Sequence, residues 1–318
     1  MKCLILGGAG FLGSHLCEGL LAAGCSVRIF DRSNIDTGNI AHVLDRIELY
    51  EGDFSDRSHY ARITQGIDIA FHLISTTIPK TSNENPPYDV ESNIVPTLHF
   101  LDAARDSGVK KIIFFSSGGT VYGIPENIPI PETHPTNPIC SYGIHKLTIE
   151  KYLMLYHRIC GLDYGILRIS NPFGERQRAG SGQGVIAAFL NRAVKGEKLE
   201  IWGDGSVVRD YIYVPDVINA AIKLMNYRGK EKIFNIGSGR GLSLQEVSKA
   251  IERAVGYPLQ IAYTPHRIMD VPVNVLDIGR SGMALEWKPL ISFENGIQNT
   301  LKSFVKDSDK SEKKRTAD

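Results

Sequence analysis

Tyr142 and Lys146 stand four residues apart in the segment CSYGIHK, a spacing that allows acid–base chemistry. If this segment is a helix, both side chains project from the same face. A free phenol titrates near pH 10, so a tyrosine acting as general base near neutrality needs its pKa lowered by about three units, or roughly 4 kcal/mol. A neighbouring ammonium favours the phenolate. Taken alone, such a pair is usually an ordinary surface pair, so it needs a partner to carry a functional interpretation.

A run of small and hydroxyl-bearing residues, SSGGT, follows the apolar segment 111–115 and can supply that partner. The strand predicted there ends at Ser116 and Ser117, at the carboxyl edge of a parallel sheet, where open α/β folds bind ligands. Hydroxyl groups at this edge can hydrogen-bond a reacting alcohol, and the glycines leave room for it. The alternative interpretation is a tight turn whose serines are incidental.

The segment GGAGFLG places Gly7, Gly10 and Gly13 between a predicted strand and a predicted helix. Without side chains there, backbone N–H groups can approach a pyrophosphate, and the helix N-terminus favours its charge. Asp31 ends the next strand, 18 residues after Gly13, where a carboxylate can accept hydrogen bonds from an adenosine ribose. This favours NAD over NADP, because a 2′-phosphate would meet a like charge, although Arg32 next to it could pair with such a phosphate. A purely structural turn is the alternative.

Two further features bear on this dinucleotide site. Asp53, in EGDFSD after the third predicted strand, either receives the adenine amino group or caps the helix that follows. The positive ring of an oxidised nicotinamide beside Tyr142 would favour the phenolate, as Lys146 does. The sequence therefore predicts hydride transfer between NAD and a sugar alcohol at the edge formed by SSGGT.

The elements that must position these residues alternate between short β-rich runs and amphipathic stretches. Such alternation indicates βαβ units and a parallel sheet covered by helices on both faces. We therefore predict an α/β fold, a Rossmann-type doubly wound parallel sheet with a smaller α/β C-terminal lobe. The expected elements are residues 3–6, 11–23, 27–30, 47–50, 67–73, 90–104, 111–115, 142–156 and 164–168.

The chain divides into an NAD-binding domain over residues 1–170 and a loop-rich second lobe over residues 171–305. Glycine- and proline-containing segments separate the helix-like stretches of the second lobe. The runs RDYIYV and KIFNIGSG, within residues 207–237, look like strands that return to the main sheet. Residues 306–318 are nearly all polar or charged and are predicted to be a disordered tail.

Composition excludes several classes of function. The chain has 36 basic and 35 acidic residues in a dispersed pattern, so no field is available to hold a nucleic acid or an anionic membrane. Five cysteines without a CxxC pair indicate a reducing compartment and argue against a metal site. With no long apolar run and no signal-peptide pattern, we expect a cytoplasmic protein that does not span a membrane.

A set of motifs over about residues 1–304 resembles the extended short-chain dehydrogenase/reductases, in their NAD-dependent epimerase/dehydratase branch. The resemblance implies that Tyr142 is the catalytic base and that Lys146 binds the nicotinamide ribose while tuning the tyrosine. In chain order the motifs are GGAGFLG, HLIS, Asn93, SSGGTVYG, YGIHK, LRISNPFG, GDGSVVRDYIYVPD and FNIGSG. The cofactor-binding residues it implies are Gly7, Gly10, Phe11, Leu12, Gly13, Asp31, Arg32, Asp53, Phe54, Leu73, Ser75, Asn93, Ser116, Tyr142 and Lys146.

The same resemblance implies a nucleotide-sugar site in the second lobe. Arg209 and Arg267 would clamp the diphosphate, which suits guanidinium geometry, and Asp270 would orient the uridine ribose or its loop. The alternative for Arg209 is a salt bridge with Asp210 or Asp216. The substrate-binding residues implied are Ser117, Tyr142, Asn171, Val185, Phe189, Arg209, Arg267, Asp270 and Asn274, the last at a position where a small residue admits N-acetyl sugars.

Two departures from the family pattern affect the expected chemistry. Gly118 stands where the family usually has a catalytic serine or threonine, so Ser117, Thr120 or a water must reach the substrate hydroxyl. Gly119 and Thr120 stand where the 4,6-dehydratases carry an Asp-Glu pair, so dehydration is not expected.

The resemblance implies a 4-epimerase that interconverts UDP-glucose and UDP-galactose, or UDP-GlcNAc and UDP-GalNAc, through a 4-keto intermediate. The alternatives are another NAD-dependent UDP-sugar enzyme (a uronate epimerase, decarboxylase or reductase) and a non-catalytic NAD-binding protein. Helices over residues 90–104 and 142–156 carry apolar residues on more than one face, and in this fold two such helices commonly form a dimer interface. A homodimer is therefore expected.

Overall fold

The main sheet of the protein has seven parallel strands. The computed structural model describes residues 1–180, 183–265 and 271–315, with side chains described up to residue 305. The strand order is β10-β6-β5-β4-β1-β2-β3, which confirms the predicted Rossmann-type sheet and places its switch point between β1 and β4. The strands are β1 (Lys2–Leu6), β2 (Ser26–Asp31), β3 (Ile47–Glu51), β4 (Ile69–His72), β5 (Lys111–Ser117), β6 (Asp163–Ile169) and β10 (Ile233–Ile236).

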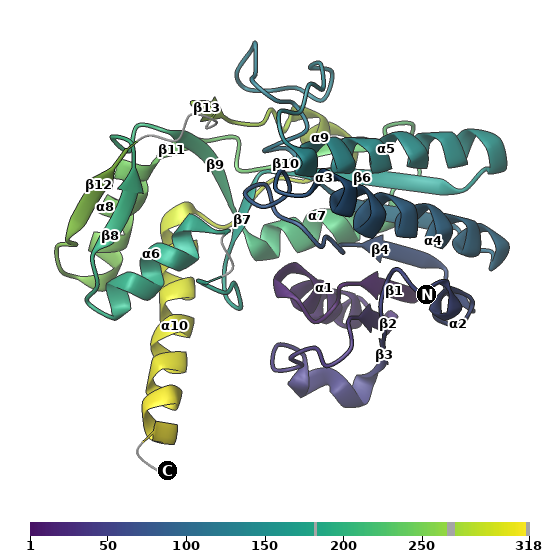
Figure 1. Ribbon diagram of the computed structural model, residues 1–318, viewed down its shortest axis with the longest axis horizontal. Helices are drawn as coiled ribbons and strands as arrows, with labels where there is room; N and C mark the ends of the chain where they lie inside the picture. The colour runs from purple at the N-terminus through teal and green to yellow at the C-terminus, as the bar shows by residue number, and fades with distance from the viewer. Residues whose placement is uncertain (181–182, 266–270, 316–318) are drawn as a thin grey trace.

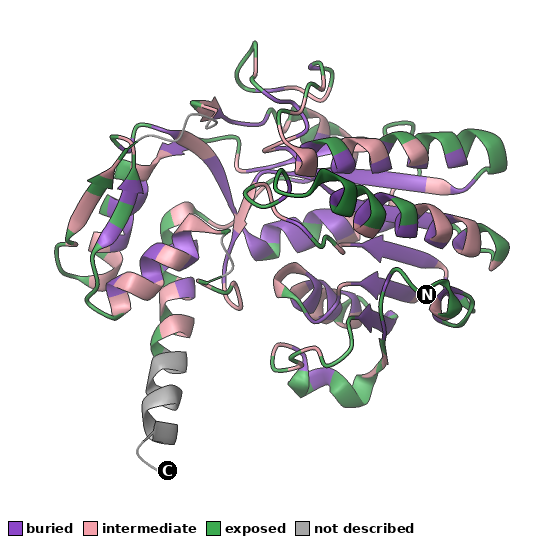
Figure 2. Cartoon of the chain, in the orientation of Figure 1, coloured by how far each residue is buried: buried purple, intermediate pink, exposed green. Residues whose placement is uncertain are grey.

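Helices cover both faces of this sheet (Figure 1). α1 packs beside α7 on one face, and α2, α4 and α5 pack together on the other. The central strands are buried along their length, as Figure 2 shows, so they read as continuous apolar runs in the sequence. The bounds are α1 (Phe11–Ala22), η1 (Ala41–Arg46), η2 (Arg57–His59), α2 (Tyr60–Thr64), α3 (Pro86–Asp89), the π-helical turn η3 (Val90–Ile94), α4 (Val95–Asp106), α5 (Ser141–Cys160) and α7 (Val214–Asn226).

The second lobe holds a four-stranded sheet and a two-stranded one. In the four-stranded sheet, β9 pairs with β7, β11 and β13, and in the other β8 pairs with β12. The strands are β7 (Asn171–Phe173), β8 (Leu199–Trp202), β9 (Val208–Tyr213), β11 (Gly241–Ser243), β12 (Ile261–Thr264) and β13 (Val273–Asn274). The helices are α6 (Val185–Val194), α8 (Leu244–Val255), α9 (Gly279–Leu285) and α10 (Phe293–Arg315).

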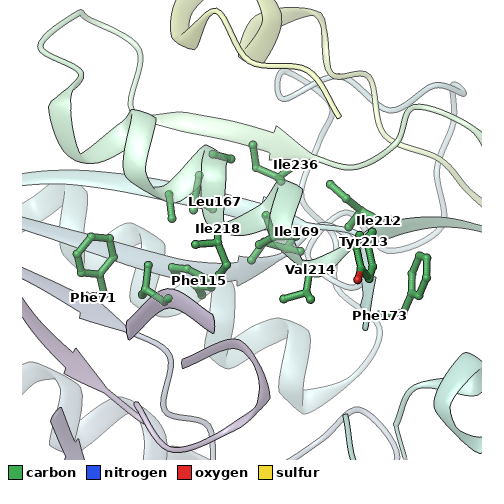
Figure 3. Packing of buried hydrophobic residues seen from close by; sticks show 14 of the residues in the cluster. Phe71, Phe115, Leu167, Ile169, Phe173, Ile212, Tyr213, Val214, Ile218 and Ile236 are labelled. Carbon is green, nitrogen blue, oxygen red and sulfur yellow. The ribbon is translucent and has the colours of Figure 1, made fainter. Parts of the chain in front are cut away.

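One hydrophobic core runs through both lobes. Figure 3 shows Phe115 and Ile169 of the main sheet continuing into Phe173 and Tyr213 of the second lobe. Full burial of a side chain of this size contributes about 1.5–3 kcal/mol. The two lobes are therefore packed against each other by shared core residues.

Two predictions about the second half need correction. KIFNIGSG does return to the main sheet as β10, but RDYIYV forms β9 in the second sheet. β9 pairs with β7, β11 and β13 of the second lobe, whereas β10 and β3 form the two edges of the main sheet. The backbone of α10 continues as helix to Arg315, where we expected disorder from residue 306; the polar segment contains no glycine or proline to end a helix already begun. None of the helices in the described residues is both long and apolar enough to cross a bilayer.

Candidate active site

The glycine turn lies between β1 and α1, beside the segment that follows β4. Gly7 has a φ of +88°, and a Cβ at Gly13 would lie 2.1 Å from the carbonyl oxygen of Gly7. A side chain at Gly13 is therefore excluded, and the N-terminus of α1 is held against the turn. Leu73 joins the site here, because its backbone N–H donates to Leu6 and the segment lies in van der Waals range of Gly7. This close backbone approach at the switch point fits a bound dinucleotide pyrophosphate.

Asp31 ends β2 and reaches the glycine turn. Its Oδ2 accepts a hydrogen bond from the backbone N–H of Ala9 at 2.9 Å, and its Oδ1 accepts from Arg32 at 2.9 Å. The side chain of Arg32 is exposed, while Phe11 and Leu12 are half-buried in the first turn of α1. The fold thus brings together the predicted pyrophosphate and ribose contacts, and their arrangement fits the cofactor of this motif.

The structure changes the interpretation of the segment after β3. Asp53 does not cap the next helix: Asp56 is the N-cap of η2, and Asp53 accepts hydrogen bonds from Ser55 at 2.8 Å. Asp53 remains exposed, so its contact with adenine stays a prediction. The ring of Phe54 packs in the core, 5.6 Å from the ring of Tyr60 between centroids.

Ser75 and Asn93 belong to the loop that follows β4 and to η3. Ser75 donates its hydroxyl to the carbonyl of Thr77, and the side chain of Asn93 accepts from the backbone N–H of Thr76 at 2.9 Å. Asn93 is buried, and its amide holds the loop that follows β4 in place at the carboxyl edge of the main sheet. Its direct contact with a cofactor stays a prediction.

The two serines at the end of β5 face different surroundings. Ser116 is buried, and its hydroxyl donates to Glu150 at 2.5 Å; Glu150 also pairs with Arg168. Its hydroxyl is therefore engaged with a buried ion pair, and the contact of Ser116 with the cofactor stays a prediction. Ser117 is half-buried and, one residue further along the strand, points to the opposite face.

Tyr142 and Lys146 lie in the first two turns of α5, as predicted. The Nζ atom of Lys146 lies 5.6 Å from the centre of the Tyr142 ring and 4.8 Å from that of Phe114. It donates to the carbonyl of Phe115 at 3.1 Å. This bond places the ammonium at the carboxyl end of β5, and Tyr142 is half-buried above it.

Burial governs the ionisation of this pair in the protein without cofactor. Burial, followed by the nearby Cys140 and Asp89, raises the pKa of the Tyr142 phenol above its ordinary range. Burial also lowers the pKa of Lys146 to about 8, against opposing effects of Asp89 and Glu150. In the protein without cofactor, burial therefore disfavours the phenolate. Ionisation near neutrality requires a further positive charge.

Gly118 and Thr120 lie under the first turn of α5. A Cβ at Gly118 would lie 2.6 Å from the buried side chain of Leu276 and 3.1 Å from the carbonyl oxygen of Arg168, so a larger residue does not fit this backbone. Thr120 contacts Gly143 of α5, and its hydroxyl oxygen is buried without a hydrogen-bond partner among the described residues. Thr120 thus has a hydroxyl that no described residue uses, beside Gly143, the residue that follows Tyr142 in α5.

Three predicted substrate residues lie on adjacent strands of the second sheet. Asn171 begins β7 and donates to the carbonyl of Asp210 at 3.0 Å, and Asn274 of β13 pairs in register with Arg209 of β9. Asn274 is buried and donates to the carbonyl of Gly118 at 3.3 Å, which links the second lobe to the SSGGT segment.

Arg209 donates to the carbonyls of Val208 and Val271, at 2.9 and 2.6 Å. The carboxylates proposed as its alternative partners are engaged with other donors. Asp210 accepts from Ser238, and Asp216 accepts from the backbone N–H groups of residues 290 and 291.

The remaining predicted substrate residues are less directly placed. Val185 is the first residue of α6, so its backbone N–H is at a helix N-terminus. Phe189 is buried in the shared core, because it lies on the inner face of α6; its ring is not presented to a ligand. Arg267 and Asp270 fall outside the described residues.

Sequence reasoning missed the residues that surround the start of α5. Ser82 accepts from the backbone N–H of Tyr142 at 3.0 Å, and Asn83 accepts from that of Ser141 at 2.9 Å. Asp89 contacts His145 from 56 positions earlier in the chain. No local pattern in the sequence could have paired these residues.

Comparison with known proteins agrees with this architecture. The model of the NAD dependent epimerase/dehydratase family matches residues 3–237. A UDP-glucose 4-epimerase of Mycolicibacterium smegmatis is 35% identical over 308 residues, covering 96% of this chain and 98% of the relative. The crystal structure of a UDP-glucose 4-epimerase from Thermotoga maritima with UDP-glucose is 36% identical, with a TM-score of 0.92 over 97% of this chain and 100% of that one.

A third comparison concerns the sugar. The structure of a UDP-N-acetylglucosamine 4-epimerase from Methanobrevibacter ruminantium, in complex with UDP-N-acetylmuramic acid, is 28% identical with a TM-score of 0.91, over 96% of this chain and 98% of that one. The family match, the near-complete coverage of the relatives and the placement of the motif residues all indicate the same family. The chain belongs to the NAD dependent epimerase/dehydratase family.

Proposed function

We propose that this protein is an NAD-dependent UDP-sugar 4-epimerase that interconverts UDP-glucose and UDP-galactose. The observation that carries the proposal is the placement of Tyr142 and Lys146 at the carboxyl end of β5, on the same sheet edge as the glycine turn. Relatives that cover nearly the whole chain and act on UDP-sugars support it.

In this mechanism Tyr142 accepts the proton of the sugar C4 hydroxyl and later returns it. When bound, NAD supplies a reversible acceptor for the C4 hydride and a positive ring that favours the phenolate. Lys146 holds the nicotinamide ribose and adds positive charge below the tyrosine. Thr120 supplies the hydroxyl that Gly118 lacks, since its buried oxygen is unpaired within the described part of the chain. Ser117 is the second candidate for this role.

The UDP moiety is anchored by Asn171 and Arg209 of the second sheet, together with Arg267 and Asp270, which the family pattern implies. Asn274 donates to the carbonyl of Gly118 and so lies next to the SSGGT segment, where we place the sugar. Its side chain is smaller than a tyrosine, so UDP-GlcNAc and UDP-GalNAc are further candidate substrates, and the Methanobrevibacter relative supports testing them.

The test is to give the purified protein UDP-galactose and UDP-GlcNAc without added NAD and to resolve the products. We expect interconversion of the C4 epimers with no net change in NADH absorbance. A product that has lost a carbon would indicate a decarboxylase, stoichiometric NADH a dehydrogenase, and consumption of added NADH a reductase. Tyr142→Phe should abolish turnover, and an unchanged rate would show that Tyr142 is not the base. Absence of any turnover by the wild type would support a non-catalytic NAD-binding protein. A uronate epimerase would act only on the UDP-uronic acids.

The assembly expected for this enzyme is a homodimer formed by α4 and α5. These helices contact each other and carry exposed apolar side chains on their outer side, visible as exposed segments in Figure 2. The exposed residues are Val95, Ile144, Met154, Leu155 and Ile159. A cytoplasmic location without nucleic-acid or membrane partners stays a prediction, which the five free cysteines, all in described segments, support.

A further inference from the structure

Asp89 is a fully buried carboxylate at the end of α3, beside the start of α5. It accepts hydrogen bonds from Thr77, from Asn93 at 3.0 Å, from Ser141 at 2.6 Å and from His145 at 3.0 Å. These donors belong to the loop after β4, to η3 and to α5. One charged group therefore ties three segments together, and its hydrogen bonds offset the cost of burying the charge.

His145 is a buried partner of this carboxylate. Its Nδ1 lies 3.0 Å from both oxygens of Asp89, so Nδ1 carries the hydrogen. Burial and the charge of Lys146 lower the pKa of His145 to about 4, so the ring is neutral near pH 7. Its Nε2 is buried without a hydrogen-bond partner in the described residues, which costs stability. Stability alone therefore does not account for a histidine at this position.

The same surroundings hold Tyr142. The ring of His145 meets the Tyr142 ring edge-on, with centroids 5.0 Å apart and planes at 71°. The first backbone N–H groups of α5 donate to Asn83 and Ser82, in the loop that also contributes to the carboxylate site. Both the backbone and the ring of Tyr142 are thus positioned by contacts around this buried pair.

We propose that Asp89 and His145 form a positioning pair that fixes the first turn of α5 and thereby sets the place of the Tyr142 phenol in the reaction. The inference rests on the proposed epimerase function. Neither residue touches the reacting atoms, so both act through Tyr142. A displacement of about 1 Å at a reacting group can cost on the order of 100-fold in rate, so a rigid mounting of the phenol matters.

The charge of Asp89 affects the pKa of Tyr142, a quantity that a purely structural role of Asp89 would leave unchanged. After burial and Cys140, Asp89 raises the pKa of Tyr142, so Asp89→Asn should lower it. Because the base must be ionised to act, the acid limb of the pH profile of kcat should then move to lower pH. The titratable and charged groups around this site are Asp89 of α3, Cys140 before α5, His145 and Lys146 on α5, and His72 of β4, which faces the last two.

The experiment compares His145→Leu with His145→Asn in the whole protein, saturated with NAD. Leucine removes the N–H that Asp89 accepts, whereas asparagine can present one near the Nδ1 position. We expect His145→Leu to lower kcat for UDP-galactose at least about tenfold with KM within about twofold, and His145→Asn to recover most of the loss. His157→Leu, an exposed position near the far end of the same helix, is the control and should leave kcat unchanged.

Two readouts are independent of turnover. Hydrogen exchange of the Ser141 and Tyr142 amides should accelerate in His145→Leu but not in His157→Leu, and the ultraviolet titration of Tyr142, taken against Tyr142→Phe, should shift to lower pH in Asp89→Asn. A kcat within about twofold of wild type in His145→Leu, or a loss that asparagine does not recover, overturns the positioning pair. If His145→Leu does not fold, the Asp89→Asn titration decides, and an unshifted phenol overturns the proposal. A wild-type protein that does not epimerise UDP-sugars refutes the proposed function instead.

Discussion

At the scale of single residues, Lys146 shows a conflict between stability and function. The residue is 2% exposed, and the pKa of its ammonium falls from 10.5 to about 8 through burial. The native state therefore releases this proton near pH 8, whereas the unfolded chain keeps it to about pH 10.5. Because the unfolded state binds more protons in this window, this group makes the free energy of unfolding rise with pH between those values.

Lys146→Met should accordingly stabilise the NAD-free protein near pH 7 by about 1–3 kcal/mol while abolishing epimerisation, since it removes a buried charge and one hydrogen bond. Urea denaturation near pH 7 and near pH 10 measures this. The wild type should gain stability over that interval relative to the variant. Lys151→Met, exposed on the same helix, should change stability by less than about 0.5 kcal/mol. Equal pH slopes in wild type and Lys146→Met would contradict the buried-charge account.

Thr120 and Ser117 compete for the hydroxyl role left open by Gly118. Thr120→Val keeps the shape of the side chain and removes a buried oxygen without a partner in the described residues, so stability should be unchanged or slightly higher. We expect kcat to fall about 100-fold in this variant and less in Ser117→Ala. Steady-state kinetics on UDP-galactose would decide, and the reverse order would assign the role to Ser117.

At the scale of elements, the β1–α1 turn depends on glycine at a defined place. A Cβ at Gly13 would meet the Gly7 carbonyl at 2.1 Å, whereas one at Gly10 would meet it only at 3.6 Å. Gly13→Ala should therefore displace α1 from the turn, lower the free energy of unfolding by about 2 kcal/mol or more and release the cofactor. Gly10→Ala is the packing control and should fold as stably as the wild type. Absorbance of copurified NAD and thermal unfolding would measure both effects, and full NAD retention in Gly13→Ala would refute the argument.

At the scale of the whole molecule, the apolar outer face of α4 and α5 predicts the assembly. Leu155 is 45% exposed on α5, and a charge there would be buried without a partner in a dimer. Leu155→Glu should weaken dimerisation at least about 100-fold, measured by light scattering over a dilution series. Met283→Glu, at an 83% exposed position on α9, should leave the assembly unchanged. A wild-type protein that remains monomeric at micromolar concentration would contradict the expected homodimer.

Local signals in the sequence were sufficient for the main sheet, the glycine turn and the Tyr142–Lys146 pair. Strand and helix periodicity, glycine at a tight turn and an i,i+4 spacing depend on neighbouring residues alone, so they can be read without a fold. By contrast, the sheet that β9 joins depends on its partners β7, β11 and β13, which lie far from it or later in the chain. The α10 backbone continues as helix where polar composition suggested disorder.

Burial and long-range contacts were decided only by the tertiary structure. The sequence predicted that Lys146 and an oxidised nicotinamide together make Tyr142 acidic, but it did not reveal that burial raises the pKa of that phenol in the protein without cofactor. From the sequence, the Ser116 hydroxyl was a candidate ligand contact. In the fold it donates to Glu150 of α5, which pairs with Arg168 of β6. Asp89 and His145 are 56 positions apart, and only the packing of α3 against α5 brings them together. Residue types and spacing identified the chemistry, whereas the electrostatic environment that controls it arises from atoms distant in the chain.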